Sequence, residues 1–164
     1  IMVTHDQEEA LTMADRIILM NNGIIEQEGS PQDLYSKPKT AFSANFIGTT
    51  NLFKAKRISD NSLEINGSTL ECNENIKDDL LTVTIRPEDI KIAQSDNEKN
   101  ILKGTIKELE FLGSNIRGHI EVNFKSEKTN IICNFASEYI LNHNIQNNTS
   151  VNISLQPHAL KIVK

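Results

Sequence analysis

The sequence has no tryptophan, and aromatic residues make up only 5% of its 164 residues. Oligonucleotide-binding β-barrels stack bases on aromatic side chains along a basic groove. This chain instead carries 17 Lys and Arg against 22 Asp and Glu, for a formal net charge of −5. Broad nucleic-acid binding depends on basic residues that displace counterions, so we expect no nucleic-acid partner.

Cysteine and long apolar runs are also scarce. Cys72 and Cys133 are the two cysteines, too few for a disulfide framework or a cysteine metal cluster. We expect both to be buried, unreactive thiols in a reducing cytoplasm. His119 and His143 have no second ligand at metal spacing, and we predict no metal site. No apolar run approaches the roughly 18–20 residues of a transmembrane helix and no signal peptide is visible, so we predict no direct membrane insertion.

The hydrophobic pattern changes near Gly48, where we place a domain boundary. Before it, strand-like and helix-like stretches alternate. Residues 1–3 (Ile-Met-Val) form an apolar run that predicts a short buried strand. Asp6 predicts a helix cap with Glu9 as its reciprocal partner, and the helix should end near Asp15 or Arg16.

A hairpin and two helices are predicted next. Asn21-Asn22-Gly23 separates two β-branched-rich runs and is typical of a tight hairpin turn. Ser30 followed by Pro31 predicts a second helix start. A further helix is expected around residues 40–47. It should bury its large apolar side chains, which are Phe42, Phe46 and Ile47.

Beyond Gly48 the chain consists of short alternating segments separated by Asn, Ser, Asp and Gly. Ten strands are predicted, over residues 52–58, 62–65, 68–72, 81–86, 90–93, 102–111, 116–124, 130–135, 150–155 and 159–163. One short helix is expected at residues 136–141. Strands spaced by about 8–12 residues favour a mainly β fold built of small barrels or a sandwich.

The second part contains an internal repeat. Residues 85–92 (Ile-Arg-Pro-Glu-Asp-Ile-Lys-Ile) resemble residues 155–162 (Leu-Gln-Pro-His-Ala-Leu-Lys-Ile). Each copy is a strand, a proline-led turn and a second strand, and the proline belongs at the corner because it cannot donate to a strand ladder. The repeat predicts two similar lobes whose strands pair.

Residues 3–10 read Val-Thr-His-Asp-Gln-Glu-Glu-Ala, and Ala14-Asp15-Arg16-Ile17, Met20, Gly23, Ile25-Glu26, Gly29 and Pro31 follow at fixed spacing. This pattern, which spans residues 1–48, resembles the end of an ABC-transporter ATPase domain. It is similar to the subfamily that energises uptake of polyamines, ferric iron, sugars, sulfate or phosphonates. The resemblance implies that His5 is the catalytic switch histidine, which faces the ATP γ-phosphate across a dimer interface. On spacing alone, His5 is a helix-cap histidine without chemistry.

The other motifs of such an ATPase are absent from these 164 residues. There is no Gly-x-x-x-x-Gly-Lys-Ser/Thr phosphate loop, no acidic Walker B strand end and no Leu-Ser-Gly-Gly-Gln signature. Phosphoryl transfer needs a cradle for phosphates and Mg²⁺, so we expect this chain alone to bind no cofactor and not to be an enzyme. ATP and Mg²⁺ belong to the longer parent, of which we expect this to be the C-terminal part.

The junction Phe46-Ile47-Gly48, with Asn51-Leu52 after it, resembles the entry to the transport-associated OB-type (TOBE) domain. Its most recognisable segment is matched by Arg86, Pro87, Glu88 and Asp89, which are therefore the candidate regulatory or interface residues. The resemblance implies an OB-like, two-lobed regulatory domain over residues 49–164, preceded by an α/β tail. In the second copy of the repeat Gln156 and His158 replace the arginine and the glutamate.

The two resemblances imply a C-terminal regulatory and dimerisation part of an importer's ATP-binding subunit. We expect a homodimer, cytoplasmic and peripheral to the inner face of the membrane, with membrane subunits and a solute-binding protein as partners. The alternative is a stand-alone small-molecule or oxyanion-binding OB-type module. Its candidate basic residues also fit a solvated strand face, and they are Lys103, Lys107, Arg117 and Lys125.

Overall fold

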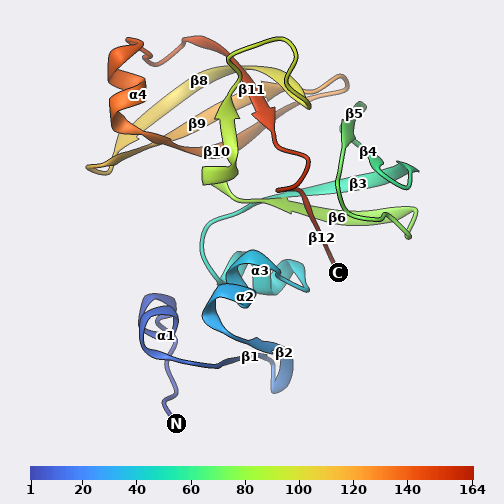
Figure 1. The fold of residues 1–164 in the computed structure, drawn as a ribbon, viewed down its shortest axis with the longest axis vertical. Helices are drawn as coiled ribbons and strands as arrows, with labels where there is room; N and C mark the ends of the chain where they lie inside the picture. Colours follow the sequence, from blue (N-terminus) through green and yellow to red (C-terminus); the bar gives the residue numbers. More distant parts are fainter.

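The structure is a computed structural model that describes residues 1–164, and it places two parts end to end (Figure 1). The N-terminal segment (residues 1–48) lies at one end, and the β region (residues 49–164) forms the larger body at the other. The last strand runs back so that the C-terminus lies beside the helices of the N-terminal segment. None of the helices combines the length and the apolarity needed to cross a bilayer.

The N-terminal segment consists of α1 (Gln7–Met13), β1 (Ile17–Asn21), β2 (Ile24–Gly29), α2 (Pro31–Ser36) and α3 (Ala41–Phe46). Each helix begins at a side-chain cap. The Asp6 carboxylate accepts hydrogen bonds from two backbone N–H groups of α1, Ser30 caps α2, and Thr40 caps α3. The predicted hairpin is present, with Asn22 and Gly23 at φ +49° and +80°. Local capping and turn chemistry therefore determine these elements.

Three expectations for this segment were wrong. Residues 1–3 form no strand and are exposed, because a strand needs a neighbour to pair with and no other strand of this chain lies beside them. Glu9 does not complete a reciprocal capping box, since its carboxylate accepts from Thr4 Oγ1 at 2.8 Å. Phe46 lies on the outer face of α3 with 38% of its surface exposed, stacked on Phe42 at 5.6 Å between ring centroids.

The β region consists of two five-stranded antiparallel sheets. Sheet one has the order β12-β6-β3-β4-β5, formed by Lys161–Val163, Leu80–Ile85, Asn51–Ser59, Ser62–Ile65 and Ser68–Glu71. Sheet two has the order β10-β9-β8-β11-β7, formed by Lys128–Ala136, Asn115–Asn123, Ile101–Phe111, Ser150–Leu155 and Ile90–Ile92. A short 3₁₀ turn, η1 (Pro87–Asp89), joins β6 to β7, and α4 (Ser137–Asn142) follows β10.

The two copies of the sequence repeat exchange strands between the sheets. The first copy is β6, η1 and β7, and the second is β11, a proline turn and β12. β7 pairs with β11, whereas β12 pairs with β6. The registers are equivalent, because Ile92 opposite Ile153 in one pair corresponds to Ile162 opposite Val83 in the other. Each sheet thus contains one strand from each copy, which ties the two sheets together.

Two asparagines connect the sheets at related places. The Asn51 side chain, at the start of β3, donates to the Ile132 carbonyl at 2.8 Å and accepts from the Ile132 N–H at 2.8 Å. The Asn100 side chain, just before β8, makes the same pair of bonds with Glu71, at 2.8 and 2.7 Å. Each carboxamide pairs like a strand residue with the outermost hairpin strand of the opposite sheet. The two sheets are therefore closed against each other by side chains as well as by strands.

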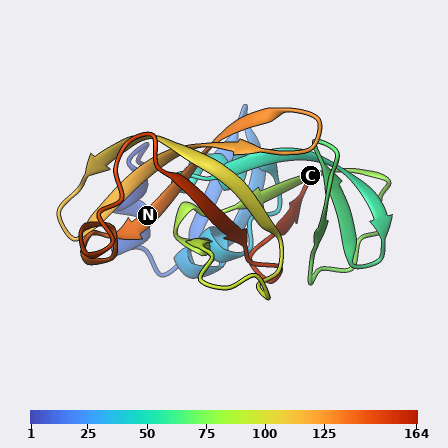
Figure 2. The ribbon, with the colours of Figure 1, turned by 90° about the horizontal axis from the view of Figure 1, so that it is seen from above.

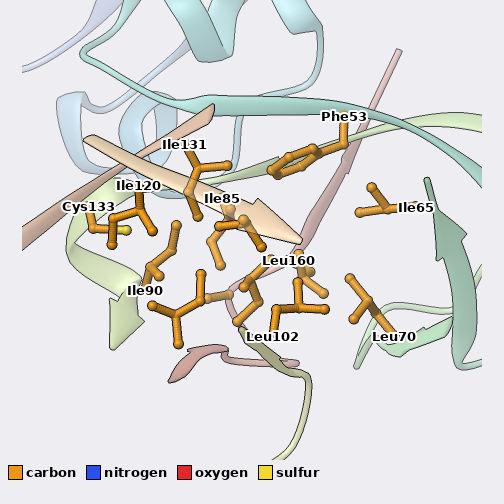
Figure 3. Packing of buried hydrophobic residues seen from close by; sticks show 14 of the residues in the cluster. Phe53, Ile65, Leu70, Ile85, Ile90, Leu102, Ile120, Ile131, Cys133 and Leu160 are labelled. Atoms are coloured by element: carbon orange, nitrogen blue, oxygen red, sulfur yellow. The ribbon is translucent and has the colours of Figure 1, made fainter. Parts of the chain in front are cut away.

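A single hydrophobic core lies between the sheets. It contains 26 buried residues drawn from both of them. Figure 3 shows Phe53 and Ile65 of sheet one facing the same interior as Ile120 and Ile131 of sheet two. The view in Figure 2 shows the strands of the β region curling around this interior. The mainly β, OB-like fold class expected from the sequence is confirmed.

The asparagine bridge yields a stability prediction. We expect Asn51→Ala to lower the free energy of unfolding by about 1–3 kcal/mol, because it leaves the Ile132 N–H and carbonyl without their partner. Asn152→Ala, at an exposed strand position, is the matched control and should change it by no more than about 0.5 kcal/mol. Urea denaturation measures both, and equal effects of the two substitutions would contradict a role for the bridge.

Candidate functional site

The guanidinium of Arg86 joins the β region to the helices of the N-terminal segment. Arg86 follows β6 directly and is buried, with 7% of its surface exposed. Its Nη1 donates to three backbone carbonyls, those of Ala44 at 2.9 Å, Thr49 at 3.1 Å and Gly48 at 3.2 Å. Its Nη2 donates to the Tyr35 carbonyl at 3.1 Å. We call Arg86 and these four carbonyls the Arg86 network.

The network caps the ends of two helices. Tyr35 lies in the last turn of α2 and Ala44 in the last turn of α3, where backbone carbonyls have no partner within the helix. A cation at a helix C-terminus is also favoured by the helix dipole. Burial lowers the pKa of Arg86 below its ordinary value, while nearby Tyr35 and Glu88 act in the opposite direction. The guanidinium stays charged at neutral pH and satisfies carbonyls that would otherwise be unpaired.

The Tyr35 side chain also contacts the face of the Arg86 guanidinium. The Arg86 guanidinium carbon lies 4.2 Å from the centre of the Tyr35 ring, a cation–π arrangement. The Tyr35 hydroxyl donates a hydrogen bond to the Glu88 carboxylate. Burial, followed by this bond to Glu88, raises the pKa of Tyr35 from 10.0 to about 12. Arg86 and Glu88 thus hold one tyrosine between them.

The other two candidate residues of this segment have different surroundings. Pro87 is buried at the first position of η1 and fixes the corner between β6 and β7. Asp89 is half-buried, and burial, followed by repulsion from Glu88, raises the pKa of its carboxyl. His158 and Lys161 of the second repeat copy act in the opposite direction. The structure therefore directs Arg86 and Glu88 towards the helices.

The second copy has no equivalent contact with the helices. Gln156 occupies the position of Arg86 in the repeat, and its Nε2 donates to Ser154 Oγ within the same copy at 2.9 Å. The C-terminal residue supplies a second link, since the Lys164 carbonyl accepts from Ala41 N–H at 2.8 Å and its N–H donates to Lys39 at 3.0 Å. Of the two proline turns, only the first anchors the N-terminal segment.

His5 lies beside α3, just before the start of α1. Its exposed imidazole lines a recess of about 240 Å³ together with Gln7, Asn45 and the two stacked rings of Phe42 and Phe46. Asp6, the next residue, is fixed as the cap of α1. A neutral imidazole in this position can both donate and accept a hydrogen bond to a group outside the chain.

The remaining candidate residues are not gathered at this junction. Lys107 pairs with Glu121 at 3.3 Å, and Arg117 lies 3.9 Å from Glu110, so two of the four basic candidates face carboxylates. Cys72 and Cys133 are buried as expected, and burial raises the pKa of both thiols. His119 has a partner that its sequence position did not reveal, the Glu110 carboxylate at 2.9 Å.

The contacts of Tyr35 and Gln7 were not predicted from the sequence. Both lie more than forty positions from a partner with which they make contact, Arg86 for Tyr35 and Gly48 for Gln7. Neither belongs to a local motif that predicts a long-range contact. The Arg86 segment was identified through its resemblance to a family motif, and the structure shows which groups Arg86 and Glu88 contact in this chain.

The Arg86 network predicts an asymmetry between the repeat copies. We expect Arg86→Met to lower the free energy of unfolding by about 2–3 kcal/mol, because it removes charge-assisted hydrogen bonds to four buried or half-buried carbonyls. Gln156→Met, at the equivalent position, should cost less than about 1 kcal/mol. Chemical denaturation compares the two, and similar losses would show that Arg86 has no special part.

Tyr35 predicts a pH dependence. Its folded-state pKa is raised above 10.0 to about 12, so its contribution to stability is fully present below pH 10 and is lost as pH rises to 12. The difference in unfolding free energy between the wild type and Tyr35→Phe should therefore change over this interval and stay constant between pH 7 and pH 9. Denaturation series at these pH values measure it. A difference that does not vary from pH 9 to pH 12 would contradict the assigned environment of Tyr35.

The chain is similar to a known domain family and to a solved structure. A family model of the TOBE domain matches residues 83–161, a range that includes the whole Arg86–Asp89 segment. A crystal structure of the cytoplasmic molybdate-binding protein ModG, with molybdate bound, is similar with a TM-score of 0.54 at 16% identity. The match covers 70% of this chain and 96% of that protein. At this level of identity the likeness concerns the fold alone.

Curated relatives extend the match into the N-terminal segment. The spermidine/putrescine import ATP-binding protein PotA of Borreliella afzelii is 42% identical over 134 residues, covering 80% of this chain and 37% of the relative. PotA of Clostridioides difficile is 43% identical over 75% of this chain and 35% of the relative. PotA of Salmonella typhimurium is 37% identical, and the match covers 74% of this chain and 35% of the relative. The chain spans little more than a third of the length of these relatives. It carries a TOBE domain, as its resemblance implied, and is related over most of its length to the C-terminal part of ABC importer ATP-binding subunits.

Proposed function

We propose that this chain is the C-terminal regulatory and dimerisation part of the ATP-binding subunit that energises an ABC-type solute importer. The observation that carries the proposal is the Arg86 network. Through it, the TOBE domain holds the ends of α2 and α3, and α3 contributes to the recess that His5 lines. A domain mounted in this way is suited to bias the position of the segment that carries His5.

The proposal divides the chain by role. Residues 1–48 are the tail of the ATPase domain, and residues 49–164 are the TOBE domain with its two similar lobes. Within that domain, Arg86 and Glu88 provide the interface to the ATPase tail, and Pro87 fixes their direction. Asp89 is proposed to face the turn of the second repeat copy, whose His158 and Lys161 oppose the effect of burial on the pKa of its carboxyl.

His5 is proposed as the switch histidine. Its imidazole is exposed and lies directly before the cap of α1, so it is available to a phosphate group held by another part of the protein. A neutral imidazole can donate to the γ-phosphate and accept from the attacking water. The phosphate loop and the signature motif do not occur among these residues. We therefore propose that the chain alone is not competent for hydrolysis.

The names of the relatives suggest the cargo. The three relatives described above are all spermidine/putrescine import ATP-binding proteins, so we propose a polyamine as the solute of the parent importer. The parent would act as a homodimer with two further kinds of partner, the membrane subunits and a solute-binding protein. We propose that the parent lies in the cytoplasm at the inner face of the membrane. ATP and Mg²⁺ would be bound by the part of the subunit that lies outside the matched third.

The alternative, a stand-alone oxyanion-binding module, has less support. The match to PotA of Borreliella afzelii covers 80% of the chain, more than the β region alone supplies, so the N-terminal segment is part of the relationship. The likeness to the molybdate-binding protein rests on the fold at 16% identity. Of the basic candidates, Lys107 and Arg117 already lie near carboxylates.

The switch role of His5 is tested in the complete ATP-binding subunit that contains this segment, assembled with its membrane subunits. We expect His5→Ala to lower the rate of ATP hydrolysis by about a hundredfold or more, because the group that orients the attacking water is lost. His143→Ala, an exposed histidine after α4, is the matched control and should hydrolyse ATP normally. Normal hydrolysis in His5→Ala would refute the role.

A further inference from the structure

We infer that Gln7 is a positioning residue that couples the Arg86 network to the segment carrying His5. This inference rests on the proposed function, in which His5 acts at ATP. The Gln7 Oε1 accepts a hydrogen bond from the Gly48 N–H at 2.6 Å. Gly48 is also a member of the Arg86 network, since its carbonyl accepts from Arg86 Nη1 at 3.2 Å. One residue is thus held from both sides.

Apart from the bond of Gln7, helix α1 is weakly attached to the rest of the chain. None of its residues is buried, and it contacts the small core of the N-terminal segment only through the partly buried Ala10 and Leu11 and its cap residue Ala14. All side-chain hydrogen bonds of residues 4–12 are local, except the one made by Gln7. The Gln7 bond is therefore the polar tie that fixes the beginning of α1, two residues after His5.

Gly48 cannot easily move, because side chains pack closely against it. Its φ is +85°, and a Cβ at this position would lie 3.1 Å from the Tyr35 ring and 3.6 Å from Arg86 Nη1. The Tyr35 ring and the Arg86 guanidinium thus pack directly against the peptide that donates to Gln7. A shift of the TOBE domain that moves Arg86 must also move the Gly48 N–H.

Gln7 and His5 lie at the same recess. Both line it with Asn45 and Phe46, so the tie reaches α1 on the face where the imidazole lies. The path runs from Arg86 through Gly48 to Gln7 and needs no other side chain. Coupling over such a contiguous path is of a size that amide exchange detects.

The experiment measures backbone amide exchange by NMR on this chain, without nucleotide. In Gln7→Met, which keeps the length but removes the acceptor, we expect the Gly48 amide to exchange about fivefold faster. The Ala10 and Ala14 amides of α1 should also exchange faster. Gln7→Glu retains an acceptor oxygen and should restore slow exchange, whereas Gln94→Met, at an exposed loop position, should change nothing.

The coupling itself is tested from the far end. Arg86→Lys does not touch α1, yet we expect it to speed exchange of the Ala10 amide about twofold or more, and to add no further effect in the Gln7→Met background. If Arg86→Lys unfolds the protein, Tyr35→Leu disturbs the network more mildly, because it removes the ring that packs on the guanidinium and leaves the backbone carbonyl in place. The inference is overturned if neither variant changes exchange in α1, if their effect persists unchanged in Gln7→Met, or if Gln7→Glu fails to restore it.

These outcomes are separable from those of the proposed function. Exchange measured without ATP reports on the Gln7 tie alone, so a negative result removes the inference and leaves the role of His5 standing. Conversely, normal hydrolysis in His5→Ala would remove the switch role, and the exchange data would still report whether the TOBE domain and α1 are coupled.

Discussion

The arrangement of the molecule depends on one guanidinium buried against backbone carbonyls. Arginine suits this place because its planar group presents several donors in fixed directions and stays charged when buried. The carbonyls it meets include those of Tyr35 and Ala44, which lie in the last turns of two short helices and lack partners within them. Lysine offers a single point charge on a flexible stem and could not reach all four oxygens with the same geometry. The cost of burying the charge is offset by satisfying carbonyls that the helices themselves leave open.

The internal repeat explains why a nearly symmetric fold has a single docking side. Both copies supply a strand, a proline turn and a second strand, and their second strands cross to pair with the opposite copy. Asn51 and Asn100 make matching bridges, so the symmetry extends to the side chains that close the sheets. It is broken at Arg86 and Gln156, where the first copy reaches the helices and the second bonds within itself. The shared features maintain the β fold, and the differing residue determines which turn meets the N-terminal segment.

Local sequence patterns predicted most helices and strands. The features that were not predicted depend on contacts between residues far apart in the sequence. Asp6 and Ser30 identified helix starts because capping is decided within a few residues. The alternation of apolar and polar residues predicted the strands of the β region, and most predicted ends lie within one or two residues of the observed ends. The strand predicted at residues 1–3 is absent, because an apolar run forms a strand only where another strand can pair with it. Phe46 misled for a related reason, since the sequence does not say which face of α3 meets a neighbour. The contacts of Tyr35, Gln7 and the two bridging asparagines join residues far apart in sequence, and no local pattern marks them.

The most direct test of the central claim follows both parts of the molecule through thermal unfolding at residue resolution. The amide of Leu34 reports on the core of the N-terminal segment, and that of Ile120 reports on the core between the sheets. In the wild type and in Gln156→Met we predict that both signals are lost at the same temperature, because the Arg86 network joins the two parts into one cooperative unit. In Arg86→Met the Leu34 signal should be lost first, well before that of Ile120. Loss of both signals together in Arg86→Met would contradict the claim that this guanidinium holds the TOBE domain to the helices.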